Sequence, residues 1–244
     1  MFQDYQHLTL DQLELLEKQT LRILVQAVQQ YSREAKELFE STPAPNDSEI
    51  IVLAEDLVQY ALEVAECYPI NTRFAGFIDY KRVRWMPTTA GLFPQALLVD
   101  AKASTENNRI TLQQSQLPMD AEFQPRGGPV ATLAAGVPAH IPVRTFSGGQ
   151  LPAISTSAFV SFHYTALANA STPPFRTLHA IYVVLLPHRL LKARYNPTPA
   201  VTFFGQGKHS PSRQEDPRIR VYFDRLRGFG YKPLISDETG PKSL

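Results

Sequence analysis

Apolar residues recur at helical spacing near the start of the chain. The positions that share this spacing are Leu13, Leu16, Leu24, Val28, Ala35 and Leu38. Thr9 and Gln12 have the separation of a capping box, in which each side chain accepts the backbone N–H of the other residue. We therefore expect one long helix from Thr9 to about Glu40, with its apolar stripe turned towards a core.

A second helix is expected after a break in this pattern. Residues 41–47 are rich in Pro, Ser, Thr, Asn and Asp, which favour turns. A second apolar stripe follows, at Ile50, Leu53, Leu57, Ala61 and Val64. Residues 1–66 are therefore predicted to form a helical N-terminal part.

From Phe74 the pattern becomes that of β-strands. Residues 74–85 and 95–103 are strand candidates joined by a segment that contains Pro and Gly, which predicts a β-hairpin. Residues 124–152 show no sustained period, and short strands are expected around 137–146. Three later strands are expected, at 154–164, 178–186 and 218–223. The fold class is therefore α/β, with a mixed sheet flanked by helices.

The bulk composition excludes several classes of protein. A chain of 244 residues with 43% hydrophobic content can bury a sizeable core. It has neither an apolar run near the roughly 20 residues that span a bilayer nor a signal peptide at its N-terminus, so we expect no membrane association and a cytoplasmic location. Cys67 is the single cysteine, and one cysteine can form neither an internal disulfide nor a thiolate zinc site. We expect Cys67 to be buried.

The net charge of +1 conceals an uneven distribution along the chain. Residues 1–66 contain thirteen acidic and four basic residues, whereas residues 189–232 contain ten basic and three acidic ones. A polyanion such as nucleic acid would suit the second segment. The alternative is that two solvated faces of opposite sign attract each other within one fold.

Asp100-Ala101-Lys102 is a candidate for hydrolytic chemistry. It follows the apolar run at 97–99, and the alternation of a strand puts Asp100 and Lys102 on one face. A carboxylate that binds a divalent metal, beside an ammonium that orients water, suits phosphodiester hydrolysis. A second carboxylate is needed, and Asp79 on the preceding strand could supply it. A buried ion pair without catalytic role explains the same pattern equally well.

The acid-x-Lys spacing occurs three times in the chain. Glu34-Ala35-Lys36 lies on the first helix and is explained as a solvated face, but Asp79-Tyr80-Lys81 competes with the triplet at 100–102. The position of Asp100 directly after an apolar run favours 100–102, because a carboxylate there requires a compensating cation.

The basic C-terminal segment contains a pair of arginines at strand spacing. Arg218 and Arg220 project from one face, and with Lys208 they could read guanine in a major groove. The alternative is salt bridges to Glu215, Asp216 or Asp224. Candidate phosphate contacts, which position a duplex without reading it, are Lys81, Arg82 and Arg84.

Two other site types are not supported by the sequence. The six histidines include no pair at i,i+4 and no cluster with cysteine, which argues against zinc. Gly205-Gln206-Gly207-Lys208 lacks the spacing of a phosphate loop and the Ser or Thr after its Lys, so no nucleotide cofactor is expected.

Five runs of the chain resemble the SfiI-like and BglI-like type II restriction endonucleases, which belong to the PD-(D/E)XK superfamily. The runs lie at 51–56, 73–85, 97–106, 115–123 and 207–211, within a resemblance over roughly positions 1–227. The resemblance implies one PD-(D/E)XK endonuclease domain over 1–244. Its parts would be the N-terminal helices at 1–66, a catalytic hairpin and following segment at 74–123, and a DNA-reading strand region at 200–227.

The resemblance also implies roles for individual residues. Asp79 and Asp100 would be the two acids of the motif and Lys102 its lysine, with Mg²⁺ held by both acids and the Ala101 carbonyl. By the same matching, the major-groove readers would be Lys208, Arg218 and Arg220.

The implied activity is cleavage of double-stranded DNA in a bacterial cytoplasm. The site would be an interrupted palindrome like GGCCNNNNNGGCC, cut to leave 5′-phosphates and 3′ overhangs, and the enzyme would be a homotetramer or at least a dimer. Two other classes stay open from the residues alone: a catalytically inactive sequence-specific DNA-binding protein, and a PD-(D/E)XK nuclease of repair or recombination.

Overall fold

The fold is built on a mixed 6-stranded sheet with the strand order β1-β2-β7-β8-β11, in which β6 also pairs with β7. The computed structural model describes residues 8–42, 47–67, 83–85, 94–144, 148–166, 176–207, 218–229 and 233–234. The strands of the sheet are β1 (Val83–Trp85), β2 (Gln95–Ser104), β6 (His140–Arg144), β7 (Gln150–Ala166), β8 (Arg176–Leu186) and β11 (Pro233–Leu234). β2 and β7 are parallel, and the other pairs are antiparallel.

Three helices precede the sheet: α1 (Leu10–Gln30), α2 (Ser32–Ser41) and α3 (Asp47–Val64). The predicted capping box is confirmed, because the Thr9 backbone N donates to Gln12 Oε1 at 2.9 Å and the Gln12 backbone N donates to Thr9 Oγ1 at 3.2 Å. The single helix expected from Thr9 to Glu40 is wrong. The helix is interrupted at Tyr31, which has non-helical backbone angles (φ −111°, ψ 14°). The Tyr31 ring packs on Tyr60 of α3 with centroids 4.9 Å apart.

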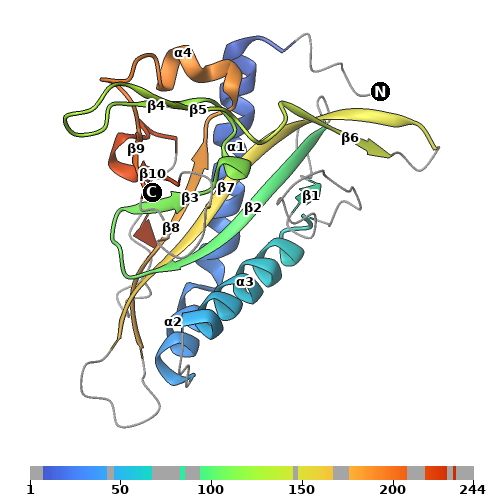
Figure 1. Cartoon of the computed structure of the whole chain (residues 1–244). Coiled ribbons are helices and arrows are strands. Elements are labelled where there is room, and N and C mark those ends of the chain that lie inside the picture. The colour runs from blue at the N-terminus through green and yellow to red at the C-terminus, as the bar shows by residue number, and fades with distance from the viewer. Residues whose placement is uncertain are drawn as a thin grey trace.

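The break at Tyr31 changes which residues of the predicted stripe are buried. Phe39 of α2 is fully buried and stacks on Phe162 of β7 at 5.4 Å, whereas the neighbouring Leu38 is exposed. Leu13, Leu24 and Val28 of α1 are buried as expected. The helices therefore cover one face of the sheet, with α2 turned relative to α1 (Figure 1).

The predicted β-hairpin is confirmed within its described part, where β1 pairs with residues 96–98 of β2. The excursion expected at 124–152 is confirmed in its short strand around 137–146, which is β6, and is wrong where β5 (Ala131–Leu133) and the start of β7 also form strands. Pro142 of β6 stands opposite Pro152 of β7. Proline is unusual within strands, which explains why the composition concealed the start of β7.

Small strands lie on the other face of the main sheet. β3 (Arg109–Leu112), β10 (Ile219–Tyr222) and β9 (Phe204–Gln206) form a three-stranded sheet, and β4 (Ala121–Phe123) pairs with β5. Figure 1 shows β3, β9 and β10 gathered beside β8, away from α2 and α3. The chain continues from β8 through η4 (Arg189–Leu191) and α4 (Lys192–Tyr195), and η5 (Phe223–Arg225) follows β10.

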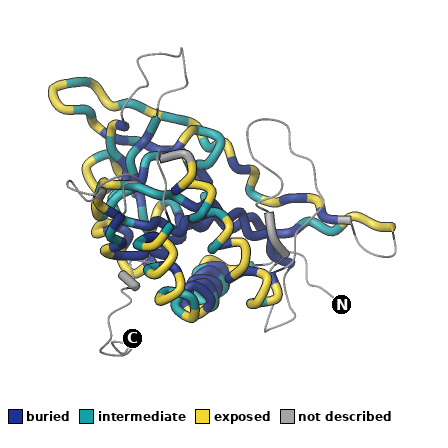
Figure 2. The backbone as a smooth tube through the Cα atoms, turned by 90° about the horizontal axis from the view of Figure 1, so that it is seen from below, coloured by how far each residue is buried: buried dark blue, intermediate teal, exposed yellow. Residues whose placement is uncertain are grey.

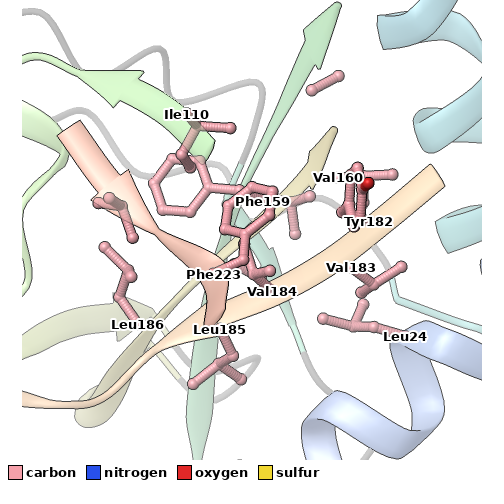
Figure 3. Close-up of a cluster of buried hydrophobic side chains, with 14 of the residues drawn as sticks. Leu24, Ile110, Phe159, Val160, Tyr182, Val183, Val184, Leu185, Leu186 and Phe223 are labelled. Atoms are coloured by element: carbon pink, nitrogen blue, oxygen red, sulfur yellow. The ribbon is translucent and has the colours of Figure 1, made fainter. Parts of the chain in front are cut away.

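The core lies on both faces of β7 and β8, because the side chains of a strand alternate. Figure 3 shows Val183 on the side of β8 that meets Leu24 of α1, while Ile110 and Phe223 pack on the opposite side with Phe159. Burial follows the same central strands, and exposed residues gather on the periphery (Figure 2). β2, next to β7, is thereby a rigid support for the residues on it.

Two expectations from composition can be compared with the described residues. Cys67 is buried, as predicted. Among the helices that the structure describes, none combines the length and apolar character needed to cross a bilayer.

Candidate active site

Asp100 and Lys102 lie side by side on β2, on the face opposite the helices. Lys102 Nζ is 2.5 Å from Asp100 Oδ2. The alternate residues of the strand, Leu97, Val99 and Ala101, are buried in the core that the helices share with the sheet. Strand alternation thus brings the predicted acid and lysine together.

The Asp100 carboxylate is buried, with the residue 7% exposed, whereas 27% of the Lys102 side chain is accessible. Their Cα partners on β7 are Phe159 and Ser161. Burial of a carboxylate is costly unless it is paired and hydrogen-bonded. The carboxylate is therefore fixed within the sheet while the ammonium can reach solvent, an arrangement that suits contact with a bound polyanion.

A second donor, Gln116, contacts the same carboxylate. Its Nε2 donates to Asp100 Oδ2 at 2.5 Å. Gln116 lies on η3 (Gln114–Gln116), a 3₁₀-helix between β3 and β4. Gln116 has no chemical pattern of its own in the sequence, because glutamine is common on surfaces and 16 residues separate it from Asp100. Its one signal is its place in the 115–123 run that carries the family resemblance.

The remaining predicted catalytic and phosphate-contacting residues are only partly described. Asp79, Lys81 and Arg82 lie outside the described residues, and of Arg84 only the backbone in β1 is described. Asp79 stands four residues before Val83, whose Cα partner is Leu98 of β2. The structure therefore describes two of the three predicted catalytic residues, Asp100 and Lys102.

The donor atoms at this site fit magnesium better than a transition metal. Asp100 and the peptide carbonyl of Ala101 offer hard oxygen ligands, and magnesium is typically bound by one or two carboxylates together with water and substrate phosphates. No group of three or more His, Cys, Asp or Glu residues suited to a metal occurs within the described ranges. The second carboxylate of the prediction, Asp79, lies outside those ranges.

The arginine pair lies on the small sheet. Ile219 and Val221 of β10 are buried, while Arg218 and Arg220 project from the other face, as the alternation predicts. Arg220 Nη2 contacts Glu106 Oε1 at 3.1 Å, and Arg109 Nε lies 3.4 Å from Glu106 Oε2. Among the described residues, the acidic partner of Arg220 is thus Glu106. Lys208 lies outside the described residues.

Ion pairs within the fold account for part of the uneven charge distribution along the chain. Arg194 binds Asp11 Oδ1 at 2.7 Å and Glu14 Oε2 at 2.8 Å. Lys18, together with Tyr195 and Arg194, lowers the pKa of Glu14 to about 2. The attraction between faces of opposite sign therefore holds for α4 and α1.

Comparisons with known proteins agree on one family. The family model described as type II restriction enzyme SfiI matches residues 35–230. The type II restriction enzyme SfiI of Streptomyces fimbriatus is 62% identical over 228 residues, which cover 93% of this chain and 84% of that protein.

Solved structures extend the comparison. Tetrameric restriction endonuclease SfiI bound to cognate DNA matches with a TM-score of 0.84 and 58% identity, covering 98% of this chain and 90% of that one. Restriction endonuclease BglI bound to its DNA recognition sequence matches with a TM-score of 0.65 and 16% identity, over 88% and 87% of the two chains. The predicted fold, a mixed α/β restriction endonuclease core, is confirmed.

Proposed function

The chain belongs to the SfiI family of type II restriction enzymes, and on that premise we propose that it is a Mg²⁺-dependent endonuclease acting through Asp79, Asp100 and Lys102. The observation that carries the proposal is the buried Asp100 carboxylate, 2.5 Å from the partly accessible Lys102 ammonium. The substrate is double-stranded DNA in a bacterial cytoplasm. The site is an interrupted GC-rich palindrome with GGCC half-sites.

Asp79, Asp100 and the Ala101 carbonyl would hold Mg²⁺, which when bound supplies a Lewis acid for a phosphate oxygen. Lys102 has the reach to orient the attacking water, because its ammonium is at the edge of the buried carboxylate and partly open to solvent. The water oxygen bonds to phosphorus as the bond to the 3′ oxygen breaks. The attacking water gives up a proton to solvent and the departing 3′ oxygen takes one from solvent, which leaves a 5′-phosphate and a 3′-hydroxyl. The Lys102 charge also offsets the negative charge that develops on the phosphate.

The strand β10 is proposed to read the DNA. Arg218 and Arg220 project from one face of it, and with Lys208 they would bind guanine edges in the major groove. Lys81, Arg82 and Arg84 would hold phosphates. A palindromic site requires a two-fold symmetric dimer, and two such dimers would form the tetramer that is seen for the relative SfiI.

Replacement of one carboxylate oxygen tests the catalytic assignment. Asp100→Asn keeps the side-chain shape but removes the charge, so cleavage of a plasmid with GGCC half-sites should fall by about 10³-fold or more. DNA affinity in EDTA should stay within a few-fold of the wild type. Asp56→Asn is the matched control, because Asp56 is exposed on α3.

The outcomes separate the alternatives. Discrete Mg²⁺-dependent fragments from the wild type, absent with Asp100→Asn, support the restriction enzyme. A wild type that binds the site and never cuts it under any divalent metal would leave a DNA-binding protein. Cutting at positions set by DNA structure would point to a repair nuclease.

A further inference from the structure

Two donors converge on one oxygen of the proposed catalytic carboxylate. Lys102 Nζ and Gln116 Nε2 each lie 2.5 Å from Asp100 Oδ2. Two donors on one oxygen restrain the rotation of the whole carboxyl group, so the direction of Oδ1 is fixed with that of Oδ2. The plane of the carboxylate is therefore set by Gln116 as well as by the lysine.

The orientation of the Gln116 amide follows from its other end. Gln116 Oε1 accepts the backbone N–H of Gln113 at 3.1 Å, so the oxygen is engaged and Nε2 is the end that faces Asp100. A carboxylate can only accept, which requires the same orientation. Both contacts of the amide thus agree on a single assignment.

Backbone hydrogen bonds and close packing hold the 3₁₀-helix that carries Gln116 against the segment at 136–137. Leu117, its C-cap, is fully buried, and its carbonyl accepts the N–H groups of Gly136 at 3.1 Å and Val137 at 2.9 Å. A Cβ at position 136 would lie 2.4 Å from Gln114 O, so this close approach needs glycine. These contacts fix the position of η3, and therefore the position of Gln116 relative to Asp100.

We propose that Gln116 is a positioning residue for hydrolysis, an inference that rests on the proposed function. As a neutral donor, it orients Asp100 without neutralising the charge that a cation requires. Lys102 can then leave the carboxylate to orient water while Gln116 keeps Asp100 in place. Partners that orient a metal-binding carboxylate typically contribute about 10- to 100-fold in metal affinity or activity.

The test is Gln116→Met, which keeps the length of the side chain and removes both the donor to Asp100 and the exposed acceptor of the Gln113 N–H. Gln114→Met is the matched control, because Gln114 lies on the same 3₁₀-helix and its side chain has no hydrogen bond to the described residues. Three quantities are measured: the single-turnover cleavage rate, DNA affinity in EDTA, and Mn²⁺ affinity by electron paramagnetic resonance on a complex with non-hydrolysable DNA.

Gln116→Met should lower the cleavage rate and the Mn²⁺ affinity by about 10- to 100-fold, with DNA affinity and melting temperature like those of Gln114→Met. A wild-type rate and Mn²⁺ affinity in Gln116→Met would overturn the proposal, as would an equal loss in the control. If the wild type does not cut, the proposed function fails, and the Mn²⁺ measurement still decides the role of Gln116.

Discussion

Glu106 contacts two arginines on the small sheet, one of them on the proposed DNA-reading strand. It lies two residues after the end of β2 and contacts both Arg109 of β3 and Arg220 of β10. The Arg220 side chain is 17% exposed, so its guanidinium is held by its neighbours and loses little freedom when it meets a base. The Glu106 carboxylate thus connects the turn after β2 to the proposed DNA-reading strand.

Glu17 is a buried acid outside the active site. It is fully buried on α1, and its Oε2 accepts the backbone N–H of His188 at 3.1 Å. Desolvation raises the pKa of Glu17 well above its usual value, and the His188 N–H offsets this only in part. The folded state therefore retains a proton that the unfolded chain releases as the pH rises past about 4.5.

This protonation makes stability fall with rising pH, and Glu17→Gln should reverse the loss. Gln mimics the neutral carboxyl and stays uncharged, so it should raise the free energy of unfolding on the order of 1 kcal/mol at pH 8. Well below pH 4.5, where both states of the wild type are protonated, the gain should vanish. Urea unfolding at both pH values measures the difference.

Glu14 provides a control of opposite sign on the same helix. Its pKa is lowered to about 2, mainly by Lys18, so its contribution to stability is present above about 4.5 and is lost as the pH falls towards 2. Glu14→Gln should therefore destabilise the protein at pH 8. A loss of stability in Glu17→Gln that is equal at both pH values would contradict the buried neutral acid.

At the scale of elements, η3 lies between the close packing around Gly136 and Asp100 of β2. Gly136 packs directly on its backbone, with the Cα of Ser115 only 2.5 Å from where a Cβ would stand. Gly136→Ala should displace η3, lower the free energy of unfolding by about 1–3 kcal/mol, and slow cleavage more than it weakens DNA binding.

Gly128→Ala is the control for this prediction. The nearest atom to a Cβ at position 128 is the Pro125 Cβ at 3.6 Å, an ordinary contact. Chemical unfolding and single-turnover cleavage of both variants would measure the effect. Cleavage by Gly136→Ala at the wild-type rate would show that the position of η3 does not matter to the site.

Sequence patterns predicted elements best where local periodicity determines them. Alternation sufficed to place Asp100 beside Lys102, and the capping box located the start of α1. The break at Tyr31 depends instead on a contact with Tyr60, which no period reveals. Gln116 and Glu106 meet their partners across 16 and 114 residues, so only the pairing of β3 with β10 and the course of η3 bring them into place.

At the scale of the whole molecule, the proposed assembly predicts how cleavage depends on the number of sites. A tetramer of two dimers would bind two DNA sites at once, and two sites on one plasmid are tethered at a high effective concentration. The mass in solution should be about four times the 27.4 kDa of the chain, measured by light scattering. Asp100→Asn should keep the same mass, because Asp100 is buried within the subunit.

A plasmid with two GGCC-type sites should therefore be cut faster than one with a single site, and a plasmid with none should stay intact. A short duplex that carries the site, added in trans, should accelerate the single-site plasmid at low concentration, because it fills the second dimer. The same duplex with an altered half-site is the control. Equal rates on both plasmids with a mass of about two chains would mean that the dimer is the active unit, and the duplex should then only compete.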